Sequence, residues 1–416
     1  MNVRASATVA AAAALLVAAG CKNGASLPGP AAQGPSTGCG SSTGGPIPPD
    51  VASAIARAVG AKPGLPGVAI GIYDRGAAYT YYAGSAVKDS SCVDGSTIFE
   101  LGSLTKTFTA AMLAHEYLAN AAVDPGQSPV RWIDMLGREN DVGDGCPPPA
   151  MPTPVPTPGY GVMATMTLST LSTHTSGLDD VDPAFDGIAE RPCMSPRVFV
   201  HYVSVYPLPS PVPTPPQPWV YSNNGYGTLG YVLQGIEHKD WFALAQSELL
   251  TPLGMTHTYD VGAVPSAGYA QGYDCTGSRA VPHWPLDPWP AAGALRSTLP
   301  DMMNYLAAAM DKSGTPPEIG AAMQRAETPV AGVQTGSGGD QGMAWAVGHF
   351  RGLAITNKDG GTDGFNSWIG IVVPASGAQA LGVVVLTNRA PGMDAPCTGY
   401  EGNPADDIGE SILENV

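Results

Sequence analysis

The stretch Phe99-Glu100-Leu101-Gly102-Ser103-Leu104-Thr105-Lys106 decides the fold, and the apolar run Thr107 to Leu113 follows it. That run predicts a buried helix, because it holds few polar residues. Ser103 and Lys106 stand three residues apart, so both lie on one face at the helix start, next to its free N–H groups. A serine hydroxyl needs a base, and a lysine serves when burial and nearby cations lower its pKa. The pair predicts a nucleophile and its base, although S-x-x-K alone is usually an incidental helix start.

A second motif, Tyr221-Ser222-Asn223, lies in an aromatic and glycine-rich segment. A tyrosine held as a phenolate by nearby cations can relay protons to a leaving group. The asparagine amide can bind both a lysine and a substrate carbonyl. Taken alone, the same residues also fit an aromatic turn that closes on Gly225.

A third motif, Lys358-Asp359-Gly360-Gly361, falls between two segments with β-strand character. Glycines there let a substrate backbone approach an edge strand. The backbone N–H of Gly361, paired with that of Ser103, would form an oxyanion hole. The alternative interpretation is a glycine-rich hairpin with a solvated lysine.

Together and in this order, the motifs resemble those of the serine β-lactamases and penicillin-binding proteins. The branch with Y-x-N in the middle contains class C β-lactamases, D-alanyl-D-alanine carboxypeptidases and related esterases, and this chain is most similar to it. The similar region runs from about Pro63 to the C-terminus. Besides the nucleophile segment it includes residues 171–178, 221–230, 249–255 and 292–298.

The resemblance implies a role for each matching residue. Ser103 would be the nucleophile and Lys106 its activating base, with Tyr221 as the second acid and base. Asn223 would bind the substrate, and Lys358 would be the electrostatic partner of Tyr221 and the substrate. His174 belongs to a similar segment that is not catalytic in the family, so we expect a structural role.

The third motif departs from the family pattern. Asp359 stands where the β-lactamases and carboxypeptidases have the threonine of Lys-Thr-Gly or His-Thr-Gly, whose hydroxyl helps to bind the substrate carboxylate. Unless it points away, an aspartate there repels a carboxylate or neutralises Lys358. We therefore expect Asp359, Gly360 and Gly361 to line a substrate site that disfavours penicillins and leaves room for neutral esters or amides.

The hydrophobic patterns predict an α/β protein with a β-lactamase-like fold. An antiparallel sheet is built from the N- and C-terminal segments, about 51–100 and 290–416, and is flanked by helices. A mainly helical region, about 101–290, is inserted between them, and the whole domain spans 50–416. The predicted helices are 51–59 and 406–416, and the predicted strands are 67–73, 77–82, 343–350, 353–356, 368–373 and 380–387.

The first twenty residues predict export. Val9 to Gly20 is an unbroken run of small apolar residues, too short to span a bilayer and typical of a signal peptide. The run ends at Cys21 in a pattern that resembles a bacterial lipoprotein signal, in which the cysteine is lipidated. We expect residues 1–20 to be this signal and the protein to be anchored in a membrane, facing the periplasm or cell exterior. The alternative is an ordinary secretory signal and a soluble secreted protein.

Residues 21–49 are rich in Gly, Ser, Pro and Ala and predict a flexible linker. Two G-x-S-x-G matches within it, 34–38 and 40–44, are chance, since neither lies between a strand and a helix. The Pro-rich stretches 147–158 and 207–218 predict stiff surface insertions.

Six cysteines remain beyond Cys21, enough for three disulfides with fifteen possible connectivities. Cys146 and Cys193 flank the same Pro-rich region, which suggests that they pair. The chain has neither a C-x-x-C nor an H-E-x-x-H pattern, so we expect no metal and no cofactor.

The composition, with 44% hydrophobic and 13% charged residues, is that of a globular protein. The net charge of −16 disfavours nucleic-acid binding, which requires a basic surface. We therefore predict a hydrolase that attacks an ester or amide, such as a cell-wall D-amino-acid peptide or a small ester, through an acyl-enzyme. The alternatives are a true class C β-lactamase, a sensor that is acylated once without turnover, and a structural lipoprotein that uses only the fold.

Overall fold

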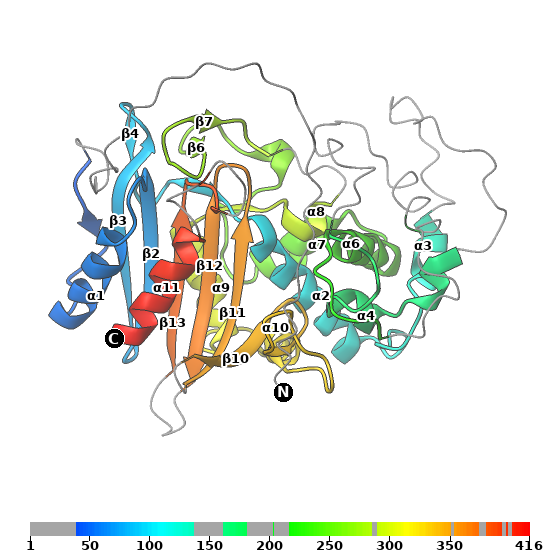
Figure 1. The fold of residues 1–416 in the computed structure, drawn as a ribbon. Helices are drawn as coiled ribbons and strands as arrows, with labels where there is room; N and C mark the ends of the chain where they lie inside the picture. The colour runs from blue at the N-terminus through cyan, green and yellow to red at the C-terminus, as the bar shows by residue number, and fades with distance from the viewer. Residues whose placement is uncertain are drawn as a thin grey trace, which may run out of the picture. The chain divides into compact units, whose positions relative to one another are not determined.

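A nine-stranded antiparallel sheet dominates the computed structural model, which describes residues 39–136, 161–180, 203, 216–284, 289–350, 353–373, 380–392, 397 and 402–416. The strand order is β1-β3-β2-β13-β12-β11-β10-β9, with β4 attached to β3 (Figure 1). The strands are β1 (Ser42–Thr43), β2 (Gly67–Asp74), β3 (Ala77–Val87), β4 (Ser91–Cys92), β9 (Asp340–Gln341), β10 (Ala346–Phe350), β11 (Leu353–Gly361), β12 (Asn366–Val373) and β13 (Leu381–Thr387).

The two ends of the chain meet in the middle of this sheet, where β2 pairs with β13. Both strands are almost wholly buried, as expected for central strands covered on both faces. The predicted fold class, an antiparallel sheet assembled from N- and C-terminal segments, is therefore confirmed.

Helices α1 (Pro49–Gly60) and α11 (Pro404–Asn415) cover one face of the sheet (Figure 1). In α1 the buried side chains recur at helical spacing, at positions 51, 54, 55, 58 and 59. All of these except Ala54 join Ile408 and Ile412 of α11 and Trp368 of β12 in one hydrophobic core. Helices from the N- and C-terminal parts of the described chain thus share this core, to which β2 and β13 also contribute.

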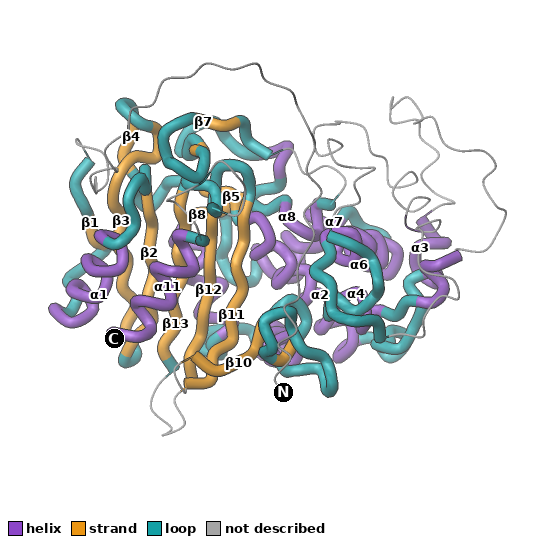
Figure 2. Tube along the Cα trace, in the orientation of Figure 1, coloured by secondary structure: helices purple, strands orange, loops and turns teal. Residues whose placement is uncertain are grey.

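The other face carries the larger core, in which α9 (Leu299–Ala309) packs against β2 and β13. Figure 2 shows most of the remaining helices gathered at one side of the sheet. They are α2 (Thr105–Ala119), α3 (Val130–Leu136), α4 (Leu168–Ser172), α6 (Asn223–Glu237), α7 (Trp241–Ala245), α8 (Pro290–Gly293) and α10 (Pro317–Glu327), with the short turns η1 (Gly102–Leu104), η2 (Gly161–Thr165), η3 (Gln246–Leu250) and η4 (Val261–Ala263). Two small sheets, β5 (Ile98–Glu100) with β8 (Arg296–Thr298) and β6 (Gly272–Tyr273) with β7 (Ala280–Val281), complete the elements.

The prediction of a flexible linker over 21–49 is wrong for residues 39–48. A disulfide joins Cys39 to Cys92, and β1 pairs with β3 at the sheet edge. A covalent bond and strand pairing order this segment although its composition resembles that of a linker. The second G-x-S-x-G match, 40–44, lies in this edge region rather than between a strand and a helix.

A second disulfide joins Cys275 to Cys397. The suggested pair of Cys146 and Cys193 lies outside the described residues, as do the first G-x-S-x-G match and all of the Pro-rich stretches except 216–218. Among the residues that are described, no helix is both long and apolar enough to cross a membrane.

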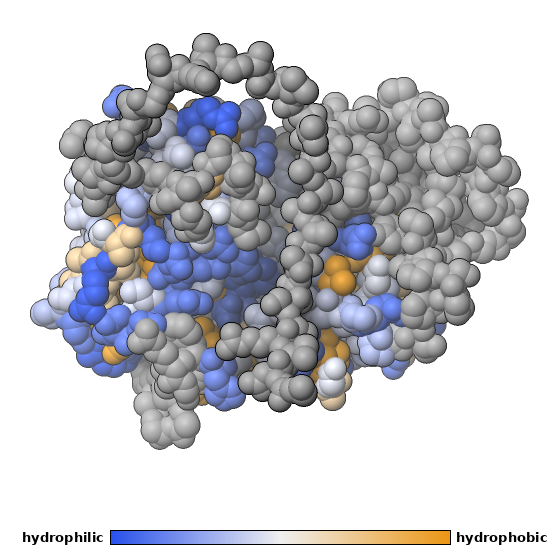
Figure 3. Space-filling model, in the orientation of Figure 1, coloured by the Kyte–Doolittle hydropathy of each residue, from blue (hydrophilic) through white to orange (hydrophobic). Residues whose placement is uncertain are grey.

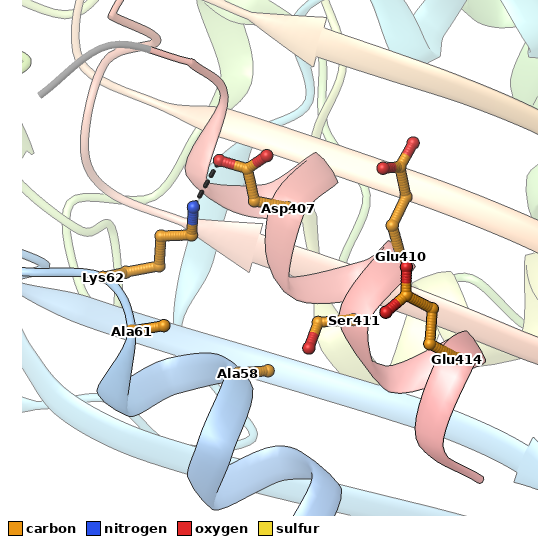
Figure 4. Close-up of a pocket in the computed structure, with 7 residues that line it drawn as sticks. All are labelled: Ala58, Ala61, Lys62, Asp407, Glu410, Ser411 and Glu414. Atoms are coloured by element: carbon orange, nitrogen blue, oxygen red, sulfur yellow. Dashed lines mark hydrogen bonds and ion pairs between the residues drawn. The ribbon is translucent and has the colours of Figure 1, made fainter.

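An acidic groove runs between α1 and α11, with Glu410, Ser411 and Glu414 along one wall (Figure 4). Lys62 crosses to form an ion pair with Asp407. In the space-filling view, hydrophilic residues predominate over the central part of the face that carries α11 (Figure 3). The groove contains none of the motif residues and is therefore not the candidate active site.

Candidate active site

The nucleophile turn is η1, which places Ser103 directly before α2. The turn requires a glycine at position 102, where φ is +52° and a Cβ would lie 2.6 Å from the carbonyl oxygen of Gly361. The Gly-Ser pair thus brings the nucleophile turn against the end of β11.

Lys106 lies on the first turn of α2 and is fully buried. Its Nζ is 2.9 Å from Ser103 Oγ, 2.5 Å from Asn223 Oδ1 and 2.9 Å from the carbonyl oxygen of Ala292. Burial and the nearby Lys358 ammonium lower the pKa of Lys106 well below its ordinary value. A neutral amine at this distance can accept the serine proton.

Tyr221 lies just before α6, and its hydroxyl donates a hydrogen bond to Ser103 Oγ at 2.7 Å. Burial raises the pKa of Tyr221 to about 12, while Lys358 opposes the rise. A phenolate in the resting site is therefore disfavoured, because burial outweighs the attraction of the cations. Tyr221 is a phenol that holds a proton ready for transfer.

His174 supports Tyr221 from behind and is only 2% exposed. The two rings stack with centroids 4.6 Å apart, and His174 Nδ1 accepts a hydrogen bond from the Ser222 N–H at 3.0 Å. Burial, Lys106 and Lys358 lower the pKa of His174 well below its ordinary value, so the imidazole is neutral. The predicted structural role thus becomes a specific one: the ring orients the tyrosine.

Lys358 approaches Tyr221 from the sheet, with its Nζ 5.3 Å from the centroid of the tyrosine ring. The same Nζ binds the carbonyl oxygen and Oδ1 of Asp359, each at 2.7 Å. Burial opposes the lysine charge, yet Asp359 and Tyr221 raise the pKa of Lys358 above its ordinary value. Asp359 does not point away: it forms the ion pair that the sequence analysis named as one alternative.

Asn223, the first residue of α6, bridges two ionisable groups. Its Oδ1 accepts from Lys106, and its Nδ2 donates to Asp180 Oδ1 at 2.8 Å. Sequence reasoning missed Asp180, which follows the segment that contains His174. The sequence signal for Asp180 was the acidic pair Asp179-Asp180, which follows Ser176-Gly177-Leu178. The local sequence does not show which of the two aspartates lies in the site.

The end of β11 forms one side of the site, and the motif from Lys358 to Gly361 lies on the strand itself rather than between strands. At Gly360 a Cβ would lie 2.1 Å from the carbonyl oxygen of Leu101, so only glycine allows this close approach. The longer strand was not predicted because Lys, Asp and Gly have low β propensity, whereas pairing with β12 overrides it.

The pairing of β11 also directs the Gly361 amide. In an antiparallel ladder, residue pairs that exchange backbone hydrogen bonds alternate with pairs that do not. The Thr362 N–H donates to the Phe365 carbonyl at 2.9 Å, so the next pair, Gly361 and Asn366, is not hydrogen-bonded. The Gly361 N–H therefore faces away from β12. On that side β10 pairs with β11 only as far as Asn357, which leaves the amide facing the nucleophile turn.

The structure thus brings together side chains from three separate segments of the chain. Ser103 Oγ lies 2.9 Å from a buried lysine amine and accepts a hydrogen bond from a tyrosine, a cation lies behind the tyrosine, and a glycine-lined strand closes the side. A hydroxyl, a neutral base, a proton donor and two amides are the groups that acyl transfer requires.

Comparison with known proteins agrees with this geometry. The family model described as Beta-lactamase matches residues 52–401. The chain belongs to the Beta-lactamase family. Its homologues are serine hydrolases with an acyl-enzyme mechanism, and the protein is therefore a serine hydrolase of that kind.

Among curated relatives of the family, a β-lactamase of Lysobacter lactamgenus is 25% identical over 386 residues, covering 84% of this chain and 90% of that protein. The unguisins hydrolase of Aspergillus violaceofuscus is also 25% identical, over 78% of this chain but only 58% of its own length. The fold matches a class C β-lactamase with a TM-score of 0.68 and 21% identity, over 88% of this chain and 96% of the other. A D-alanine carboxypeptidase of Burkholderia cenocepacia gives 0.65 and 22%, over 88% and 99%.

Three carboxylates, those of Glu116, Glu237 and Glu248, gather at the far end of α2, with ligand atoms within 4.8 Å of one another. Burial and the neighbouring acids raise the pKa of Glu248 to about 7, and burial also raises the pKa of Glu116. The cluster contains no residue of the catalytic motifs.

Proposed function

We propose that this protein is an exported hydrolase that transfers the acyl group of an ester or amide from Ser103 to water, and that its substrates carry no carboxylate on the leaving group. One observation carries the proposal: a fully buried lysine amine, whose pKa is lowered by burial and by the nearby Lys358, lies 2.9 Å from the serine oxygen. The same oxygen accepts a hydrogen bond from a protonated tyrosine.

Acylation begins when Lys106 takes the Ser103 proton and Oγ attacks the substrate carbonyl carbon. The N–H groups of Ser103 and Gly361 stabilise the negative charge on the carbonyl oxygen. The intermediate then collapses, and Tyr221 gives its proton to the leaving group. This leaves an ester on Ser103, an ammonium at Lys106 and a phenolate at Tyr221, which the Lys358 ammonium stabilises.

Deacylation restores each proton to its place. The Tyr221 phenolate takes a proton from water, and the resulting hydroxide attacks the ester carbon. As the bond to Ser103 breaks, the Lys106 ammonium returns its proton to Oγ. The cycle consumes one water and releases an acid and the protonated leaving group, with no other reactant.

The ion pair between Lys358 and Asp359 favours uncharged leaving groups. A substrate carboxylate would have to displace the Asp359 carboxylate from the Lys358 ammonium or lie beside it, at a cost in either case. A cell-wall D-amino-acid peptide lacking a free carboxylate next to the cleaved bond, or a small ester, avoids this repulsion.

A serine-reactive probe tests the proposed chemistry. We expect a fluorophosphonate to add one adduct to the wild type, measured by intact mass, and none to Ser103→Ala. Steady-state assays should then show turnover of 4-nitrophenyl butyrate and slow hydrolysis of nitrocefin. Absence of any Ser103 adduct would contradict the mechanism and leave only a fold shared with enzymes.

A class C β-lactamase is the second candidate, since solved structures of that class share the fold. Rapid nitrocefin hydrolysis would favour it over the first. A sensor that is acylated once is distinguished by time: its penicillin adduct on Ser103 should persist for hours, whereas an enzyme should release the adduct within minutes.

We also propose that the protein is exported and held at a membrane through lipidated Cys21. Support comes from the N-terminal sequence pattern, and the two disulfides are compatible with an oxidising compartment. Metabolic labelling with a radioactive fatty acid should mark the wild type but not Cys21→Ser. A labelled Cys21→Ser protein would contradict lipidation at this residue.

A further inference from the structure

Asp180 adds a negative charge to the site that the mechanism does not use. Its side chain is exposed, and its Oδ1 accepts a hydrogen bond from Asn223 Nδ2 at 2.8 Å. Asn223 in turn binds Lys106, which binds Ser103 Oγ. The carboxylate is therefore connected to the nucleophile through only two side chains.

The mechanism fixes which part of a substrate this carboxylate meets. Tyr221 protonates the leaving group, so the leaving group lies on the side of Tyr221, Lys358 and Asp359. The acyl group lies on the opposite side of the reacting carbon, toward Asn223 and Asp180. Asn223 Nδ2 already donates to Asp180, which directs this side toward a substrate group that donates rather than accepts hydrogen bonds.

The charges around Ser103 favour a cation. Burial lowers the pKa of Lys106 and of His174 and raises the pKa of Asp406, so each of these groups is shifted toward its uncharged form. Lys358 and Asp359 neutralise each other as an ion pair. Desolvation raises the pKa of Asp180, and Lys106 and Lys358 oppose that rise. Within the described part of the chain, the Asp180 carboxylate pairs with the Asn223 amide and forms no ion pair.

We propose that Asp180, held by Asn223, forms a subsite that selects acyl groups carrying an ammonium, such as those of amino-acid or other amine-bearing esters and amides. The inference rests on the proposed function, because it needs Ser103 to be acylated with Lys106 neutral. It goes further by naming the chemistry of the acyl group.

Three rigid benzoate esters test the subsite: the 4-nitrophenyl esters of 4-(aminomethyl)-, 4-ethyl- and 4-(carboxymethyl)benzoic acid. They carry a positive, neutral or negative group that cannot reach its own ester. The kcat/KM of each ester is divided by its rate constant for hydrolysis by hydroxide, which corrects for differences in the intrinsic reactivity of the three esters. We expect kcat/KM to fall in the order cation, neutral, anion, with the cation about tenfold above the neutral ester.

Variants separate this charge effect from a loss of folding. Asp180→Asn should bring the cation-to-neutral ratio to about one, since this ratio cancels any change in rate that the two esters share, and Asp180→Lys should favour the anionic ester. Asp179→Asn removes the same charge from the adjacent position and should keep most of the wild-type ratio.

Equal rates for the cationic and neutral esters in the wild type, or an unchanged ratio in Asp180→Asn, would overturn the subsite while leaving the proposed function intact. If no ester were hydrolysed and no probe labelled Ser103, the proposed function would fail and the subsite with it.

Discussion

Replacing Asp359 by Asn should convert the enzyme toward substrates with an anionic leaving group. The change keeps the shape of the side chain and removes its charge. Lys358 then loses its ion-pair partner and becomes available to a substrate carboxylate, as a lysine next to a threonine would be in the family pattern. Asp359→Thr should act in the same direction and add a hydroxyl donor.

The size of the effect follows from the geometry of the ion pair. Lys358 Nζ and Asp359 Oδ1 are 2.7 Å apart, and the Asp359 side chain is 49% exposed. A substrate carboxylate on the other side of the ammonium would lie about 5 Å from the Asp359 carboxylate. With an effective dielectric constant between about 20 and 80, the repulsion is about 1–3 kcal/mol, or about 5- to 150-fold in rate.

The assay uses two phenylacetate esters that differ in the leaving group, 3-carboxyphenol or its neutral analogue 3-carbamoylphenol. We expect Asp359→Asn to raise kcat/KM for the carboxyphenyl ester at least fivefold and to leave the carbamoylphenyl ester within about twofold. Asp363→Asn, four residues along and in the hairpin that follows β11, is the matched control for a general change in charge. An equal change for both esters, or a decrease for the anionic one, would refute the reasoning.

Other substitutions test the base, the strand, the acidic cluster and a disulfide. In the wild type, kcat/KM should rise as pH rises through the lowered pKa of Lys106, because only the neutral amine can take the serine proton. Lys106→Met, measured over the same pH range, should reduce kcat/KM by about 10⁴ or more. Gly360→Ala places a Cβ 2.1 Å from a backbone carbonyl, so β11 must shift and kcat should fall at least about 100-fold, with an unchanged circular dichroism spectrum as the control. Glu248 binds its proton more tightly in the folded protein, because its pKa is raised from 4.5 to about 7, so the free energy of unfolding should fall as pH rises between these values. Calorimetry should show that Glu248→Gln is about 1–2 kcal/mol more stable than the wild type at pH 8, after allowance for the partial exposure of Glu248. At pH 4 the variant should show no such gain. Replacing Cys275 and Cys397 by Ser opens a link across 122 residues and should lower the free energy of unfolding by about 3–5 kcal/mol, measured by urea denaturation; an unchanged midpoint would contradict this pairing.

Much of the site could be predicted because its reacting residues lie in short sequence motifs. Ser103 and Lys106 share one helical turn, and the helix geometry alone places the amine near the hydroxyl. The strands on either side of the long helical insertion alternate or run apolar, which indicates a sheet made from both ends of the chain. Resemblance to a family then connected the distant tyrosine and lysine motifs to this turn.

What the sequence could not supply were the consequences of burial and of neighbours brought in by folding. The cations near Tyr221 suggested a phenolate, but burial raises the pKa of Tyr221 and favours the phenol. Nothing in the local pattern showed that His174 stacks on that ring. The composition of residues 39–48 indicated a linker, whereas a disulfide and an edge strand hold them in the fold.

The sequence by itself determined the reacting groups, because a nucleophile and a base one helical turn apart need no distant information. Only the tertiary structure decided the charge that surrounds them. It places Asp359 on Lys358 and Asp180 on Asn223, and it removes water from Lys106. Protonation and electrostatic selectivity depend on desolvation and on distances between segments, and these exist only once the chain is folded.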